Sequence, residues 1–180
     1  MKILMISPFS EGAASTKRFL NFSKRLSKNN KVTIIMPNYD VHSNYKKITS
    51  EKKDNINIIY PRYPKIKFLN LYAYLYMLSS CFSVLKGRFD IIYALKASPL
   101  SISGIVAKKY HKKILVLDVD DLESEVIKEQ KGKGVIYLLS KYFEKMMPRN
   151  SEEIIVVSSY LKREAEKDNE LKSKKIKRGI

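Results

Sequence analysis

The sequence predicts an α/β domain built on a doubly wound parallel sheet with helices on both faces. Short apolar runs alternate along the chain with longer segments in which apolar residues recur at helical spacing. Strands that are apolar throughout belong to parallel sheets covered on both sides. The chain has 180 residues and is 44% hydrophobic, which suits one globular domain with a substantial core.

The elements follow one another in a regular order. Each expected strand is a run of apolar residues that a proline, a glycine or a polar residue ends: 2–7, 32–36, 56–60, 89–95, 114–119 and 154–157. Each expected helix carries apolar residues at spacings of three and four: 15–28, 68–85, 99–110, 135–147 and 160–167. Segment 38–55 is polar and unpatterned, so it predicts a loop with room for a short helix.

Prolines and serines support several of these boundaries. Pro37 and Pro61 end the second and third strands, and Pro148 limits the helix that starts at residue 135. Ser98 and Pro99 are typical of a helix start, with a capping side chain and proline at the first helical position.

The chain has a formal net charge of +17. Such a surplus attracts anions, including nucleic acid, acidic lipid headgroups and phosphorylated substrates. The lysines are spread along the whole sequence, which argues against a nucleic-acid partner and also fits an ordinary solvated surface. The single cysteine, Cys81, excludes an internal disulfide framework, and we interpret it as a small buried hydrophobe and not as a nucleophile.

The apolar segment 68–85 raises the question of a membrane. It contains no charged residue and is just long enough to span a bilayer, but Asn70 and three serines weaken that interpretation. We expect a helix packed on the sheet, with one face touching an anionic membrane surface. The N-terminal apolar run ends at Ser7-Pro8 and does not resemble a signal peptide. The expected location is therefore cytoplasmic, peripheral on the inner face of the cell membrane.

Ligands of doubly wound sheets bind outside the carboxyl ends of the strands, so the candidate site residues are sought there. After the first strand, Ser10, Gly12 and Ala13 lie in a loop of small residues that lets the backbone approach a phosphate at a helix N-terminus. A single glycine excludes the dinucleotide fingerprint. The alternative is a tight turn with close helix–sheet packing.

Three aspartates, Asp118, Asp120 and Asp121, lie at the end of the fifth strand. Alternation places Asp118 and Asp120 on the same face of an extended strand. Crowded carboxylates raise one another's pKa, which favours a general base, although metal coordination or helix capping would use the same residues. Neither His42 nor His111 has a partner at metal-binding spacing, so we assign no metal site.

Two more segments follow strands. Lys96 and Ser98 would contact an anion and a sugar hydroxyl, or else be a solvated lysine and a helix cap. Ser158 would contact a ligand or only cap the last helix. The sequence contains no nucleophile elbow, P-loop or zinc pattern.

Five motifs occur in one order along nearly the whole chain: MKILMISP with the Gly12 loop, NKVTIIMP, FDIIYA, LDVDDL and IIVVSSYL. In this order they resemble the N-terminal domain of GT-B fold glycosyltransferases, in particular glycosyltransferase family 4. The family's glycine pair is here Gly12-Ala13, and the histidine often found in its fifth-strand motif falls at Asp120.

The resemblance implies a Rossmann-like fold that forms one half of a GT-B enzyme. It implies transfer of a sugar, of the hexosyltransferase type, from a nucleotide-sugar donor to a polysaccharide or glycolipid acceptor, with no other cofactor. Asp120, with Asp121 or Asp118, would take the proton from the acceptor hydroxyl, and the Gly12 loop would face the donor phosphates. We expect residues 1–170 to be the acceptor-side domain and 171–180 a basic tail leading to an absent donor-binding domain.

Two other functions stay open. A non-catalytic, membrane-associated partner subunit of a split glycosyltransferase would recruit a second chain that carries the donor-binding domain. A basic nucleic-acid-binding module of Rossmann-like fold would need basic residues clustered on one face, which the scattered lysines do not suggest.

Overall fold

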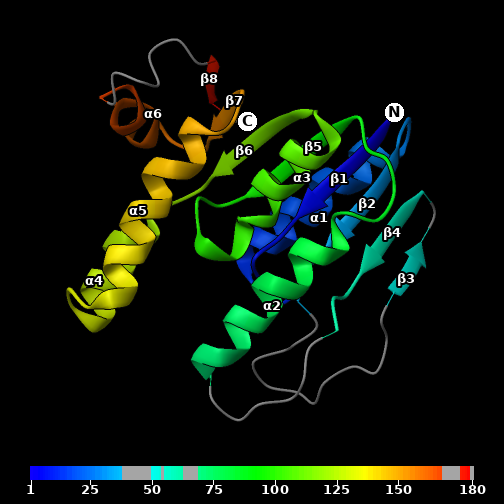
Figure 1. Ribbon diagram of the computed structural model, residues 1–180. Helices are drawn as coiled ribbons and strands as arrows, with labels where there is room; N and C mark the ends of the chain where they lie inside the picture. Colours follow the sequence, from blue (N-terminus) through cyan, green and yellow to red (C-terminus); the bar gives the residue numbers. More distant parts are fainter. Residues whose placement is uncertain (38–49, 54, 63–68, 168–174, 179–180) are drawn as a thin grey trace.

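The computed structural model describes residues 1–37, 50–53, 55–62, 69–167 and 175–178. Within these ranges one sheet has the strand order β3-β4-β2-β1-β5-β6-β7-β8 (Figure 1). The strands are β1 (Lys2–Ile6), β2 (Lys31–Ile35), β3 (Ser50–Lys53), β4 (Ile56–Ile59), β5 (Ile91–Leu95), β6 (Ile114–Val119), β7 (Glu153–Val156) and β8 (Lys175–Arg178). Every neighbouring pair is parallel except β3 and β4, which are antiparallel.

Helices cover both faces of this sheet (Figure 1). They are α1 (Ala14–Ser27), α2 (Leu69–Ser83), the 3-10 helix η1 (Pro99–Ser101), α3 (Ser103–His111), α4 (Glu123–Lys131), α5 (Val135–Arg149) and α6 (Ser159–Glu166). The predicted Rossmann-like doubly wound α/β fold is therefore confirmed.

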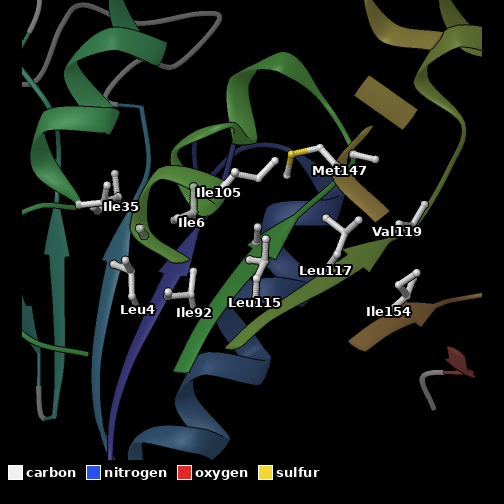
Figure 2. Close-up of a cluster of buried hydrophobic side chains, with 14 of the residues drawn as sticks. Leu4, Ile6, Ile35, Ile92, Ile105, Leu115, Leu117, Val119, Met147 and Ile154 are labelled. Carbon is white, nitrogen blue, oxygen red and sulfur yellow. The ribbon is translucent and has the colours of Figure 1, made fainter. Parts of the chain in front are cut away.

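Alternation along each strand divides the core into two clusters. On one face, strand residues such as Leu4, Ile92 and Leu117 pack with Ile105 of α3 and Met147 of α5 (Figure 2). On the other face, the neighbouring strand positions pack against α1. The residues of that second cluster include Ile3, Met5, Phe19, Val32, Ile34 and Leu95. Both faces of the central strands are buried, which explains why their sequences are mostly apolar.

Two strands lie in segments where the sequence predicted none. Strand β3 lies in the segment expected to be a loop, and most of that segment, 38–49 and 54, is outside the described residues. Strand β8 lies in the segment expected to be a basic tail, and it pairs with β7.

Helix α2 packs on the sheet, as expected for the apolar segment. The buried Tyr76 hydroxyl donates a hydrogen bond to the Ser7 carbonyl oxygen at 2.7 Å, while Leu78 and Phe82 are exposed. Among the described residues, no helix is both long enough and apolar enough to cross a membrane. Cys81 is half-buried, and this burial raises the pKa of its thiol, in agreement with a structural role.

Candidate functional site

The predicted site residues come together where β1, β5 and β6 end. These three strands are adjacent and parallel, so their carboxyl ends meet at one edge of the sheet. Lys96 follows β5, Asp118 lies in β6, and Asp120 and Asp121 follow it. The Lys96 amide donates a hydrogen bond to the Asp118 carbonyl oxygen at 2.7 Å, which continues the β5–β6 ladder by one residue.

Lys96 has an unusual backbone. Its φ angle is +64°, in the left-handed region, and its side chain turns inward so that the residue is only 6% exposed. That conformation costs a residue with a β-carbon about 1–2 kcal/mol. The contacts of the side chain must hold it in place.

The Lys96 ammonium lies among three carboxylates. Nζ donates to both Asp121 carboxylate oxygens, at 2.7 and 2.8 Å, and also to Glu123 Oε1. Asp120 Oδ1 is 3.4 Å away, and the centroid of the Phe9 ring is 5.1 Å from Nζ. The described hydrogen bonds of the Lys96 ammonium are thus made to carboxylates of the protein. The alternative interpretation of Lys96 as a solvated surface lysine is therefore wrong.

Opposing effects act on the Lys96 ammonium. Burial lowers its pKa, but the hydrogen bonds to Asp121 and Glu123 and the nearby carboxylates outweigh burial and raise the pKa above its ordinary value. Lys96 is therefore positively charged at neutral pH. We call Lys96, Asp120, Asp121 and Glu123 the lysine–carboxylate cluster.

Asp120 is the least satisfied member of this cluster. Its Oδ1 atom is buried and accepts no hydrogen bond, while Lys96 Nζ lies 3.4 Å away. Burial raises the pKa of the Asp120 carboxyl, and this outweighs the lowering by Lys96. A half-buried carboxylate with a raised pKa and an acceptor atom that makes no hydrogen bond has the properties of a general base.

Asp118 has a different role from Asp120. It is only 2% exposed, and both its carboxylate oxygens are occupied: Arg18 donates to Oδ1 at 2.9 Å and the Tyr93 hydroxyl to Oδ2 at 2.7 Å. Because Arg18 lies in α1, Tyr93 in β5 and Asp118 in β6, these hydrogen bonds connect the helix to both strands. Asp118 therefore holds these elements together, and each of its two oxygens already accepts a hydrogen bond.

Tyr93→Phe tests the structural role of Asp118. The substitution leaves a buried carboxylate oxygen without its donor, so we expect the free energy of unfolding to fall by about 1–3 kcal/mol. Urea denaturation followed by circular dichroism measures this. Tyr160→Phe, at a site 54% exposed, is the matched control and should change nothing. Equal stability of all three proteins would contradict the role assigned to Asp118.

The loop between β1 and α1 borders the cluster through Phe9. The Ser7 hydroxyl donates to the Phe9 carbonyl oxygen at 2.8 Å, and the Ser10 carbonyl oxygen accepts from the Ala13 amide at 3.3 Å. Ala13 precedes α1, where no side chain caps the helix. Ser10, Gly12 and Ala13 thus surround an uncapped helix start, the arrangement that suits a phosphate.

The two predicted serines lie apart from this cluster. Ser98 is buried, and its hydroxyl is 3.4 Å from that of Ser101. Ser158 Oγ accepts the Leu161 amide at 3.1 Å and caps α6. Among the described residues, no hydrogen bond or ion pair joins either serine to the lysine–carboxylate cluster. The capping interpretation explains Ser158, whereas the Ser98 hydroxyl makes no capping bond.

A cavity of about 630 Å³ lies between the sheet and helices α5 and α6, and its lining includes Ala97, Val119 and Leu122. None of the four members of the lysine–carboxylate cluster is among its described lining residues. Lys145 and Arg149 of α5 line it as well. It is large enough for a sugar-sized molecule and combines apolar walls with charged groups, as ligand pockets do.

No protein-family model matches the chain, and no curated protein does. Among solved structures, the chain resembles sucrose-phosphate synthase from Thermosynechococcus elongatus, with a TM-score of 0.64 and 14% sequence identity. The match covers 99% of this chain and 47% of the synthase chain, so this chain spans about half of its structural neighbour. At that identity the likeness shows the fold, which is GT-B-like, and does not distinguish family 4.

Proposed function

We propose that this chain is the acceptor-side half of a glycosyltransferase that uses a nucleotide sugar. The observation that carries the proposal is Asp120, a half-buried carboxylate whose Oδ1 atom accepts no hydrogen bond, at the carboxyl edge of a GT-B-like sheet. The five sequence motifs that resemble family 4 support the same interpretation. The acceptor would be a polysaccharide or a lipid-linked saccharide of the cell envelope.

In the proposed reaction, Asp120 takes the proton from an acceptor hydroxyl. That oxygen forms a bond to the anomeric carbon of the donor, and the bond from this carbon to the nucleotide phosphate breaks. The nucleoside diphosphate leaves with the bonding electron pair. In this proposal the backbone amides at the uncapped start of α1, which follows Gly12 and Ala13, would receive the phosphate oxygens.

Lys96 assists this reaction without touching the acceptor. Its ammonium holds Asp121 and Glu123 by hydrogen bonds but only approaches Asp120, so one carboxylate of the cluster keeps a free acceptor atom. Most of the donor site would come from a second domain, on the same chain or on a partner chain. We place the assembly on the cytoplasmic face of the membrane, with no nucleic acid involved.

The test uses the native protein from its own cells, with a tag at Met1 and with whatever further domain or partner it carries. Peptide mass mapping first shows whether sequence continues beyond Ile180 and whether a second chain co-purifies. The preparation is then given radiolabelled nucleotide sugars and a lipid extract of the same cells. We expect label to move into an extractable acceptor. Label that stays in the donor with every sugar tried would contradict the proposal.

A further inference from the structure

Helices α4 and α5 form a hairpin that projects from the rest of the domain (Figure 1). They pack against each other, and a short turn with Gly132, Lys133 and Gly134 joins them. One side of α5 is buried, with Tyr137, Ser140 and Met147 turned inward. The proposed reaction gives no role to the other side.

That other side carries large apolar residues in solvent. Val135, Leu138 and Tyr142 are 72%, 62% and 62% exposed, and their spacings of three and four place them in one stripe along the helix. Ile136 of α5 and Val126 of α4 are also exposed. Helix α5 is thus apolar on two sides, whereas a helix that only packs on its own domain needs one.

Lysines flank the stripe. Lys133 precedes it, and Lys141 and Lys145 lie three residues beyond Leu138 and Tyr142; all three are exposed. The nearby acidic residues Glu125 and Glu144 are engaged: Glu125 pairs with Lys128 at 2.9 Å, and Glu144 accepts the Ser124 amide at 2.7 Å. The flank of the stripe is therefore basic.

We propose that this face of the α4–α5 hairpin docks on an anionic lipid bilayer. Val135, Leu138 and Tyr142 enter the headgroup boundary, and Lys133, Lys141 and Lys145 contact lipid phosphates, the arrangement of interfacial helices. A second copy of the chain is a poorer occupant, because it also carries a net charge of +17 and would place lysines against lysines.

Helix α2, which the sequence suggested as the membrane contact, is the natural competitor. It exposes Leu78 and Phe82 at 52% and 70% and contains no lysine or arginine itself, although the exposed Lys86 and Arg88 follow its C-terminal end. Both helices therefore offer apolar area, but only on α5 do lysines lie within the helix, next to the apolar stripe. The inference does not rest on the proposed function, since vesicle binding requires no sugar transfer.

The chain contains no tryptophan, so a single introduced one reports on its own surroundings. Leu138→Trp and Phe82→Trp place it on α5 or on α2, at exposed positions that should not disturb folding. We expect the emission of the Leu138→Trp variant to shift to the blue and to be quenched by brominated lipid on phosphatidylglycerol–phosphatidylcholine vesicles. Phosphatidylcholine vesicles alone should leave this emission unchanged, and the emission of the Phe82→Trp variant should be that of a solvent-exposed indole with both kinds of vesicle.

Four results would overturn the proposal. The first is failure to sediment with anionic vesicles. The second is sedimentation with no change in the emission of the Leu138→Trp variant, which means adsorption by charge alone. A shift confined to the Phe82→Trp variant would assign the membrane contact to α2. A shift of the Leu138→Trp emission with protein concentration, in the absence of vesicles, would assign the face to a second copy.

A paired substitution gives an independent measure. Leu138→Ser with Tyr142→Ser removes two apolar side chains from the stripe and keeps every charge, so we expect vesicle affinity to fall at least ~10-fold. Leu78→Ser with Phe82→Ser is the matched control on α2 and should keep wild-type affinity. Circular dichroism verifies that both variants are folded. Equal affinity of the two variants would overturn the proposal.

Discussion

Asp120→Asn is expected to lower turnover at least ~100-fold in the native assembly, in line with loss of a general base. Asparagine keeps the size of the side chain but cannot accept the proton of the acceptor hydroxyl. The free energy of unfolding should stay the same or rise, because burial already disfavours the charged form of Asp120 and the substitution removes that charge. A loss of activity with full stability separates catalysis from folding.

The pH profile sharpens this prediction. The proposed reaction requires ionised Asp120, whose pKa burial raises above the ordinary 3.8. The wild-type kcat/KM should therefore fall as the pH decreases through the raised pKa, and the residual activity of Asp120→Asn should not show that limb. For stability the sign is opposite: a raised carboxyl pKa costs stability above the folded-state value, and the cost disappears as the carboxyl becomes protonated.

Asp121→Asn is the matched control for catalysis. Asp121 is close to Asp120 in sequence, but its side chain is 41% exposed and both its oxygens already accept from Lys96. We expect a smaller loss of turnover than with Asp120→Asn. Near-normal turnover of Asp120→Asn would remove Asp120 from the role of base, and a larger loss with Asp121→Asn would transfer the role to Asp121.

Lys96→Met is expected to lower the free energy of unfolding by about 3 kcal/mol near neutral pH. Breaking a buried ion pair from one side costs about 3–5 kcal/mol, and the low end applies because Asp121 is partly exposed to water. Methionine fills a similar volume but leaves Asp120, Asp121 and Glu123 without their cation. Guanidinium denaturation of the folded chain measures the difference.

This loss should shrink as the pH is lowered. Without the ammonium, the pKa values of Asp120 and Glu123, which burial already raises, rise further. Each raised carboxyl pKa costs stability while the group is ionised and ceases to do so once it is protonated. The gap between wild type and Lys96→Met should therefore be larger at about pH 8 than at about pH 5. A gap that widens towards acid would refute this electrostatic account.

Two truncations separate the charge from the backbone strain. Lys96→Ala and Lys96→Gly both remove the ammonium, but only glycine adopts a φ of +64° without a steric penalty. Lys96→Gly should therefore be more stable than Lys96→Ala by about 1 kcal/mol. Equal stability would mean that the turn at residue 96 stores no strain.

The sequence predicted the fold well because the sheet is covered on both faces. Buried parallel strands such as β5 require apolar residues on both faces, and this signal is visible in a single sequence. Strand β3 was missed because Ser50–Lys53 contains no apolar residue and pairs only with β4 at the edge of the sheet. Strand β8 was missed for a similar reason, since Ile176 is its one apolar residue.

The site could be predicted only in part. Lys96 and Asp120 follow neighbouring strands, so the topology alone brings them together. The partners of Asp118 could not be found in this way: Arg18 is 100 residues away on α1, and Tyr93 resembles any other apolar strand residue. Glu123, the fourth member of the cluster, was also missed. Its position two residues after Asp121 was the signal by which the sequence could have revealed it.

The strand order has a consequence for synthesis of the chain on the ribosome. β1 is made first and lies at the centre of the sheet, between β2 and β5. Sixty residues, from Ile35 to Leu95, separate the ends of its two partners. At a synthesis rate of about 5–20 residues per second, one edge of β1 stays unpaired for roughly 3–12 s until β5 has been made. During that time the apolar side chains from Ile3 to Ile6 belong to an open half-sheet, so the nascent chain is most exposed to misassembly before residue 95 emerges.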